Sequence, residues 1–231
     1  FYTMSYFQNP TGISYSKEKK LKILELANKY DFYIIEDDYL SELIFDENIK
    51  HEPFRVLDTN DRVIYIKSFS KIFLPGIRLG YIICPEEFRE SIQNSKINTD
   101  IATSTLMQRA LEMYIKEGYW IGYIDDLKNG YIKRYELMKK LLNEKLKDYV
   151  AFMDPRGGLS FYLNIKNKNI QSKELFYKLK EKGVYITPGT IFYRGLNLGE
   201  SYFKIGFSQV NEDEILRGID IIKEELQQWH I

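Results

Sequence analysis

Three apolar runs, separated by a helix-like segment and a polar connection, constrain the fold more than any other feature of this sequence. The first run, FYTMSYFQ, leads through NPTG into a segment whose apolar residues include Leu21, Leu24 and Ala27 at helical spacing. The second run, residues 32–35, ends in EDD, and the third, residues 63–66, is followed by KSFSK. The order strand, helix, strand, connection, strand is typical of a sheet with parallel strands and covering helices. We therefore predict an α/β fold with a mostly parallel sheet.

The rest of the chain predicts long helices and then a smaller domain. Residues 86–147 read mostly as helix, and residues 121–146 are long enough for a helix that leaves one domain and begins another. Beyond it, YVAFMD, LSFYLNI, GVYITP and YFKIGFS are candidate strands, with helices near residues 173–182 and 212–228. We therefore divide the chain into residues 1–118, part of a larger domain; residues 119–147, a long interdomain helix; and residues 148–231, a small α+β domain.

The composition excludes several classes of protein. Thirty-three Lys and Arg residues balance thirty-three Asp and Glu residues, so no global field draws the chain to nucleic acid or anionic lipid. One cysteine, Cys84, and two histidines, His51 and His230, exclude a disulfide framework and leave too few ligands for a structural zinc site. The absence of an apolar run of about 18 residues argues against a membrane span. A reducing cytoplasm is the expected compartment.

Polar residues of different kinds follow the three apolar runs. Asn9 lies just past the first run, Asp37 just past the second and Lys71 just past the third. Ligands of open α/β sheets bind beyond the carboxyl ends of the strands, so we expect these three groups to meet at one edge. Each motif alone fits an ordinary turn, a solvated helix start or a surface charge. Their order and shared placement indicate a binding site.

The residues around Lys71 suit an aldehyde cofactor that carries a phosphate group. A buried lysine amine forms a Schiff base with an aldehyde, and it is more reactive where burial or nearby cations favour its neutral form. Ser68, Ser70 and Arg78 offer two hydroxyls and a guanidinium fork, which together suit a phosphate group. This short segment therefore predicts both a covalent anchor and a phosphate site.

The other strand-end residues suit the ring of the same cofactor. Asp37 would hold a pyridine nitrogen in its protonated form, which turns the ring into an electron sink. Tyr39 and Asn9 would donate hydrogen bonds to the phenolate oxygen of that ring.

The motifs NPTG, EDDY, SFSKIFLPGIRLGY, RGGLSFYL and YITPGTIFY resemble those of the fold-type I aminotransferases of class I and II, whose cofactor is pyridoxal 5′-phosphate (PLP). The resemblance covers essentially the whole chain. It implies a three-layer PLP transferase large domain, present in part, and a small α+β domain. It also implies that Lys71 forms the aldimine with the cofactor and shuttles protons. The cofactor-binding residues that it implies are Asn9, Asp37, Tyr39, Ser68, Ser70, Lys71 and Arg78.

The close spacing of Asp37 and Tyr39 in EDDYLSE particularly resembles the aminotransferase-like domain of MocR/GntR-type transcriptional regulators. In many catalytic relatives the tyrosine comes one place later. Those regulators carry an N-terminal winged-helix DNA-binding domain that these 231 residues lack. The resemblance therefore implies that DNA would be contacted only through such an additional domain.

Two departures from the family pattern affect the expected site. The family usually has an arginine in the strand that here reads YFKIGFS, where it grips the substrate carboxylate, and this chain has Lys204. Lysine offers a point charge in place of a fork, so we expect ordinary amino acids to bind weakly or differently. The resemblance implies that Asn9 and Lys204 bind the substrate.

The second departure concerns length. Phe1 is not Met, and FYTMSYFQ reads as a strand in progress, so we expect the sequence to begin inside a longer protein. In the family, the preceding residues supply a phosphate-binding turn, a ring-stacking side chain and part of the dimer contact. The resemblance thus implies that this chain holds about half of the cofactor shell, and that the intact protein is a homodimer.

Three functions fit these residues. The first is a transaminase that moves an amino group between an amino acid and a 2-oxo acid through Lys71. The second is a sensory domain of a transcriptional regulator, which uses the same chemistry to detect PLP or an amine. The third treats Asp37 and Asp38 as a metal-dependent sugar-nucleotide site, and it leaves Lys71 and the S-x-S-K spacing unexplained.

Overall fold

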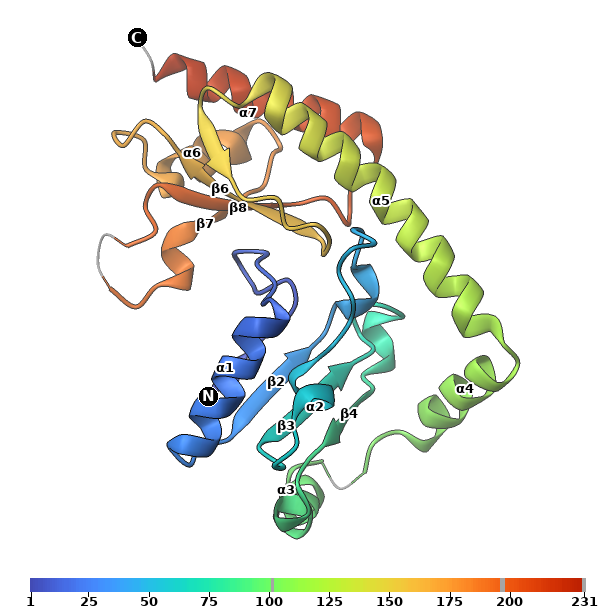
Figure 1. Ribbon diagram of the computed structural model, residues 1–231. Helices are drawn as coiled ribbons and strands as arrows, with labels where there is room; N and C mark the ends of the chain where they lie inside the picture. The colour runs from blue at the N-terminus through green and yellow to red at the C-terminus, as the bar shows by residue number, and fades with distance from the viewer. Residues whose placement is uncertain (101, 196–197, 230–231) are drawn as a thin grey trace. The chain divides into compact units, whose positions relative to one another are not determined.

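The computed structural model describes residues 1–100, 102–195 and 198–229 (Figure 1). His230 lies outside the described residues. Among the described residues, none of the helices combines the length and the hydrophobicity that a bilayer crossing requires.

The chain forms two compact units. The first consists of residues 1–8 and 14–128, and the second of residues 9–13 and 129–231. The longest helix, α5 (Tyr119–Lys145), belongs in part to each unit. The division into domains drawn from the sequence stays a prediction.

The first unit is built on a sheet with the strand order β1-β2-β3-β4, of which Figure 1 labels β2, β3 and β4. Its strands are β1 (Tyr2–Thr3), β2 (Ile34–Asp38), β3 (Val63–Ser68) and β4 (Gly80–Ile83). The first three are parallel, and β4 runs antiparallel to β3. The mostly parallel sheet that the sequence predicts is therefore confirmed. β1 is shorter than the run FYTMSYFQ indicates, and a φ of 50° at Phe7 departs from extended backbone.

Helices cover this sheet because their apolar residues face its buried side chains. The hydroxyl of Ser16 caps α1 (Lys17–Lys29) by accepting from the N–H of Lys19. The short helix α2 (Phe54–Leu57) follows the polar connection. One core cluster joins the two helices to the sheet, and it consists of Leu24, Ala27, Ile34, Phe54 and Val63.

Long helices follow the sheet, as the sequence predicts. α3 (Arg89–Asp100) contains no buried residue, and α4 (Thr105–Lys116) buries only Leu111. Leu111 packs with two buried apolar residues of the segment after Lys71, and the flanking aromatic residues Phe69, Phe73 and Trp120 join this cluster. Single 3-10 turns occur at Ser41–Leu43, Pro75–Ile77, Glu86–Phe88 and Gly189–Phe192.

The second unit is a small α+β domain. Its sheet has the order β5-β6-β8-β7 and is antiparallel throughout. The strands are β5 (Val150–Phe152), β6 (Ser160–Ile165), β7 (Thr187–Pro188) and β8 (Tyr202–Gly206), and the helices are α6 (Ser172–Glu181) and α7 (Glu212–Gln228). Burial alternates along β6 and β8, which gives the sheet one buried face and one more accessible face.

Candidate active site

The carboxyl ends of β2 and β3 lie next to each other in the first unit. The strands are parallel, and Asp38 at the end of β2 pairs with Lys67 of β3. Asp37 therefore emerges at the same edge as Ser68, where the turn that carries Lys71 begins. The structure thus brings two of the three predicted strand-end groups, Asp37 and Lys71, to one edge.

Asn9 belongs to the second unit, where it meets Lys204. The Nζ of Lys204 donates to the Oδ1 of Asn9 over 3.0 Å. These two residues are 195 positions apart in the chain. The two residues predicted for the substrate are therefore in direct contact.

The segment from Ser68 to Arg78 folds back on itself. The N–H of Phe69 donates to the carbonyl of Leu79 over 3.0 Å, and the N–H of Ser70 donates to the Oγ of Ser68 over 3.3 Å. Arg78 takes a left-handed φ of 51°, an uncommon conformation for a residue other than glycine. Its Nη1 donates to the Oγ of Ser70 over 3.4 Å. Two hydroxyls and a guanidinium therefore gather on one turn, and this donor set suits a phosphate group.

Lys71 lies on the exposed side of this turn. The residue is exposed, whereas the next residue, Ile72, is fully buried. The amine makes no hydrogen bond or ion pair with any of the described residues. The sequence led us to expect a buried lysine. The structure instead shows an anchored backbone that presents an accessible amine.

Asp37 and Tyr39 already have hydrogen-bond partners. The hydroxyl of Tyr2 donates to the Oδ2 of Asp37 over 2.6 Å, and the hydroxyl of Tyr39 donates to the carbonyl of Phe7 over 2.9 Å. Burial raises the pKa of Tyr39 to about 12, with a smaller contribution from the charge of Asp37. Tyr39 is therefore a neutral donor at pH 7. To donate to a cofactor oxygen, it must exchange the carbonyl of Phe7 for that oxygen.

A buried polar network lies behind this edge, and sequence reasoning missed it. The carboxylate of Asp38 accepts from the hydroxyl of Tyr65 and contacts the Nε2 of His51, both over 2.7 Å. The Nζ of Lys67 lies 3.5 Å from the Oδ1 of Asp38 and donates to Glu42 over 2.8 Å. Burial alone would raise the pKa of Asp38, but the hydrogen bond with His51 and the charge of Lys67 hold it well below its usual range.

The alternation of inward and outward side chains along β2 is the sequence feature that could have predicted this network. Ile34, Glu36 and Asp38 face the buried side, whereas Asp37 does not. Glu36 accepts from the N–H groups of Phe54 and Arg55 over 2.9 and 3.1 Å, and also from the Ser5 hydroxyl. Glu36 therefore helps to place α2. The two adjacent aspartates have different surroundings, although the sequence grouped them as one acidic motif.

A cavity of about 420 Å³ opens within the second unit. Its lining includes Phe152 of β5, Tyr162 of β6 and Tyr202 of β8. Lys204 pairs directly with Tyr162 across β6 and β8, and its Nζ lies 5.3 Å from the centre of the Phe192 ring. The contact between Asn9 and Lys204 therefore borders an aromatic surface.

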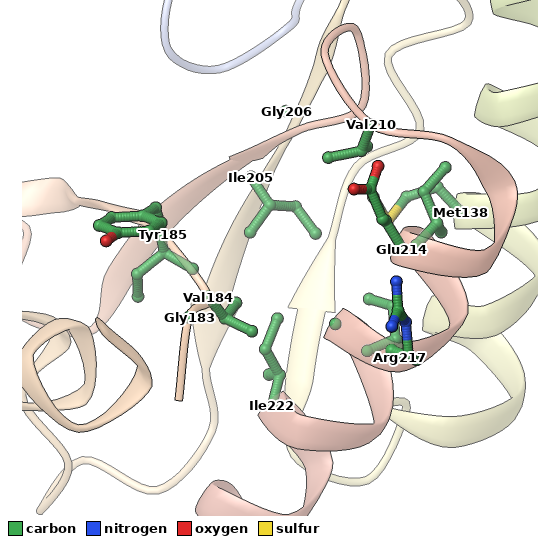
Figure 2. Close-up of a pocket in the computed structure, with 14 residues that line it drawn as sticks. Met138, Gly183, Val184, Tyr185, Ile205, Gly206, Val210, Glu214, Arg217 and Ile222 are labelled. Atoms are coloured by element: carbon green, nitrogen blue, oxygen red, sulfur yellow. The ribbon is translucent and has the colours of Figure 1, made fainter. Parts of the chain in front are cut away.

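A second cavity, of about 360 Å³, is shown in Figure 2. It is lined by Ile205, which alternates with Lys204 and so points to the opposite face of β8. Figure 2 shows Glu214 and Arg217 on one side and Tyr185 on the other. The Oε2 of Glu214 accepts from the N–H of Asn211 over 2.8 Å and completes a capping box for α7. None of the predicted site residues lines this cavity.

The described residues contain no group of three or more His, Cys, Asp and Glu side chains arranged to hold a metal ion. Asp38, one of the two aspartates in the metal hypothesis, is instead held by His51, Tyr65 and Lys67.

Comparison with known proteins identifies the family of this chain. The family model "Aminotransferase class I and II" matches residues 4–222. The chain is 33% identical to aromatic-amino-acid aminotransferase 1 of Thermococcus litoralis over 98% of its own length and 54% of that protein. It is also 30% identical to the uncharacterized HTH-type transcriptional regulator YcxD of Bacillus subtilis, over 98% of the chain and 51% of that protein.

Solved structures show the same likeness. Kynurenine aminotransferase of Pyrococcus horikoshii, crystallised in complex with PMP, superposes with a TM-score of 0.92 at 31% identity, over 98% of this chain and 55% of that one. The multiple substrate aminotransferase of Thermococcus profundus gives a TM-score of 0.90 at 32% identity, over 98% of this chain and 57% of that one. The chain thus spans about half the length of the relatives that it matches.

Proposed function

Because the chain belongs to the class I and II aminotransferases, we propose that it forms the part of a PLP-dependent transaminase that carries the catalytic lysine. The protein would transfer an amino group from an amino acid to a 2-oxo acid. One observation carries this proposal: the accessible amine of Lys71, the contact between Ser70 and Arg78, and the carboxylate of Asp37 share one sheet edge. An amine, a phosphate-binding set and a carboxylate are what an aldehyde-bearing pyridine phosphate requires.

The residues present fit this cofactor. Ser68, Ser70 and Arg78 would bind its phosphate with two hydroxyls and a guanidinium. Asp37 would keep the ring nitrogen protonated, and Tyr39 would donate to the ring oxygen. The bound cofactor supplies an electron sink that lets an amino acid lose its α-proton.

Lys71 has two tasks in this proposal. Its Nζ would hold the aldehyde of the cofactor in the absence of substrate, and the same amine would act as the base that moves the α-proton of a bound amino acid. The buried Ile72 and the hydrogen bond from the N–H of Phe73 to the carbonyl of Phe69, 2.9 Å long, anchor the turn on both sides of the lysine. The backbone is therefore fixed, while the long side chain can swing between these positions.

Lys204 and Asn9 would bind the α-carboxylate of the substrate. The ammonium already donates to the amide oxygen of Asn9, so a carboxylate that takes this place gains a charge-assisted hydrogen bond. A lysine gives one point of attachment where a guanidinium fork gives two. We therefore expect weaker discrimination between carboxylates than an arginine would provide.

The second candidate is a sensory domain of a MocR-type regulator. It is favoured by the similarity to YcxD and to the regulator TauR of Rhodobacter capsulatus, which is 28% identical over 94% of this chain. The EDDY spacing and Lys204 also favour it. In that case Lys71 would bind the same cofactor, and the response to an amine would be a change of shape.

For the whole protein we propose a homodimer in the cytoplasm. The presence of a single cysteine supports a reducing compartment. Contact with DNA belongs to the regulator hypothesis alone, and there it needs a domain additional to these residues.

The test is transfer of labelled nitrogen. The purified protein is loaded with PLP and incubated with ¹⁵N-labelled amino acids and a panel of 2-oxo acids, and newly labelled amino acids are detected by mass spectrometry. We expect transfer that Lys71→Ala abolishes and that Lys22→Ala, a change of an exposed lysine on α1, leaves intact. Cofactor retained by Lys71 without any transfer would favour the sensory domain. If the protein neither retains the cofactor nor transfers nitrogen, both candidate functions are contradicted.

A further inference from the structure

Tyr2 contacts the carboxylate that the proposed function assigns to the cofactor ring. It lies on β1, which pairs in parallel with β2, and its register partner there is Ile35. Because side chains alternate along a strand, Tyr2, Ile35 and Asp37 share one face of the sheet. The hydroxyl of Tyr2 reaches the neighbouring strand and donates to the Oδ2 of Asp37 over 2.6 Å. This length is typical of a hydroxyl that donates to a carboxylate.

The backbone around Tyr2 is fixed by its pairing with β2. The N–H of Ile35 donates to the carbonyl of Phe1 over 2.8 Å, directly before Tyr2 in the chain. The residue after Tyr2, Thr3, is buried and pairs with Glu36. Tyr2 itself is 56% exposed, so its ring buries little apolar surface. Its hydroxyl therefore supplies the specific contact of this side chain.

One oxygen of Asp37 stays available beside this contact. A carboxylate can accept about four hydrogen bonds through its two oxygens. The Oδ1 of Asp37 makes no hydrogen bond or ion pair with any of the described residues. The hydroxyl of Tyr2 thus holds Oδ2 and leaves Oδ1 for another donor, such as the ring nitrogen of the proposed cofactor.

A neutral donor on Asp37 also affects where a shared proton lies. Partial burial raises the pKa of Tyr2, and the hydrogen bond with Asp37 raises it further, so the hydroxyl keeps its proton at pH 7. A hydrogen bond to the charged form of a carboxyl group favours that form. With the hydroxyl in place, the arrangement that has the charge on Asp37 and the proton on a pyridine nitrogen is therefore favoured.

From these contacts we propose that Tyr2 is a positioning residue of the cofactor site: its hydroxyl orients Asp37 and keeps the proton that Asp37 shares with the cofactor on the ring nitrogen. The inference rests on the proposed function, because it takes Asp37 as the partner of that nitrogen. It goes further by assigning a role to a residue of β1 that lies outside the family motifs. The role is the same in a transaminase and in a sensory domain, since both bind the same cofactor.

The test is the ¹⁵N chemical shift of PLP labelled at its ring nitrogen, measured by NMR on the loaded protein without a substrate. The shift reports whether the nitrogen carries a proton, so its change with pH gives the proton affinity of the ring. Tyr2→Phe removes only the hydroxyl. The loss of a hydrogen bond to a charged group should lower this affinity about tenfold, which moves the midpoint of the titration down by about one pH unit.

Tyr33→Phe is the matched control. Tyr33 also donates to a carboxylate, that of Glu87, but it lies at the opposite end of β2 from Asp37. This variant should leave the midpoint unchanged. If Tyr2→Phe binds too little PLP for NMR, 3-fluorotyrosine in place of Tyr2 provides a stronger donor and should move the midpoint up. A midpoint that stays in place or falls with this residue would overturn the proposal.

Urea unfolding of both variants separates positioning from a purely structural role. If Tyr2 only joins β1 to β2, Tyr2→Phe should reduce stability and leave the ¹⁵N titration unchanged. That result, or an equal shift of the midpoint in Tyr33→Phe, would overturn the proposal and leave the proposed function intact. An unmodified protein that binds no PLP at Lys71 would instead contradict the proposed function, and the role of Tyr2 with it.

Discussion

Two regions of the first sheet differ in which side chains they bury: the carboxyl ends of β2 and β3, and the edge strand β4. At the first, Glu36, Asp38 and Lys67 are buried, and each has charged or hydrogen-bonded partners. At the second, Tyr81, Ile82 and Ile83 are 44%, 48% and 42% exposed. Hydropathy alone would predict that the charged residues are exposed and the apolar residues are buried. The inward charges fix the position of the candidate site, and we expect the exposed apolar strand to contribute little to the stability of the first unit.

The largest effect should follow removal of Asp38. Asp38→Ala leaves Tyr65, His51 and Lys67 without their shared acceptor, and the loss of one partner from a buried ionic network typically costs about 3 to 5 kcal/mol. Urea unfolding monitored by circular dichroism measures it. Glu144→Ala, at an exposed ion pair with Lys140 on α5, should cost under about 1 kcal/mol. Similar losses in the two variants would remove the distinction between the regions.

Lys20 should give the next largest effect, and it depends on pH. Burial lowers the pKa of Lys20 to about 8, although its Nζ donates to the carbonyl of Glu52 over 2.8 Å. The unfolded lysine, with a pKa of about 10.4, binds the proton more strongly, so the free energy of unfolding should rise between about pH 8 and 10. The rise should be on the order of 1 to 3 kcal/mol. Lys20→Met should reduce the rise of the free energy of unfolding with pH in this range. A variant with the same rise would contradict the burial of a charged Lys20.

Glu36 and Asp38 should respond to acid in opposite directions. The pKa of Asp38 is held low, so its contribution to stability is present above the unfolded value of about 3.9 and is lost as the pH falls toward the folded value. Burial raises the pKa of Glu36, so its contribution is present below the unfolded value of about 4.3 and is lost as the pH rises through the folded value.

Stability measured from pH 3 to 7 separates the two groups. Asp38→Asn should reduce the loss of stability on acidification, and Glu36→Gln should increase it. Changes of the same sign in the two variants would contradict the assignment.

The smallest effect should come from the exposed strand. Ile82→Thr keeps β-branching on β4 and removes an apolar group that is already half in contact with water. The expected change in the free energy of unfolding is within about 0.5 kcal/mol. A loss above 2 kcal/mol would show that the β4 edge is as important to stability as the buried network.

Much of the fold could be predicted from local patterns. The apolar runs that end at Ile35 and Ile66 became β2 and β3, and the polar groups beyond them became the edge with Asp37 and Lys71. These predictions needed only alternation, helix spacing and the rule that the carboxyl ends of parallel strands lie at the same end of a sheet. The family motifs then assigned chemistry to the residues at that edge.

The remaining features depend on contacts between distant residues. The pairing of Asp38 with Lys67 follows from the register of two strands, which no single stretch of sequence reveals. The contact of Lys204 with Asn9 and the hydrogen bond of Tyr39 with Phe7 also join distant segments. The exposure of Lys71 depends on how the turn packs through Ile72. The periodicity of the sequence therefore could not predict which distant side chains contact each other.

Borohydride reduction of the purified protein with bound PLP, followed by peptide mass spectrometry, tests directly whether Lys71 holds the cofactor. Reduction fixes the cofactor to whichever lysine holds it, and Lys71→Arg keeps the charge while removing the reactive amine. We expect one modified peptide, labelled at Lys71 and absent from the variant. Labelling scattered over surface lysines and unchanged by Lys71→Arg would contradict the assignment of this edge as the cofactor site.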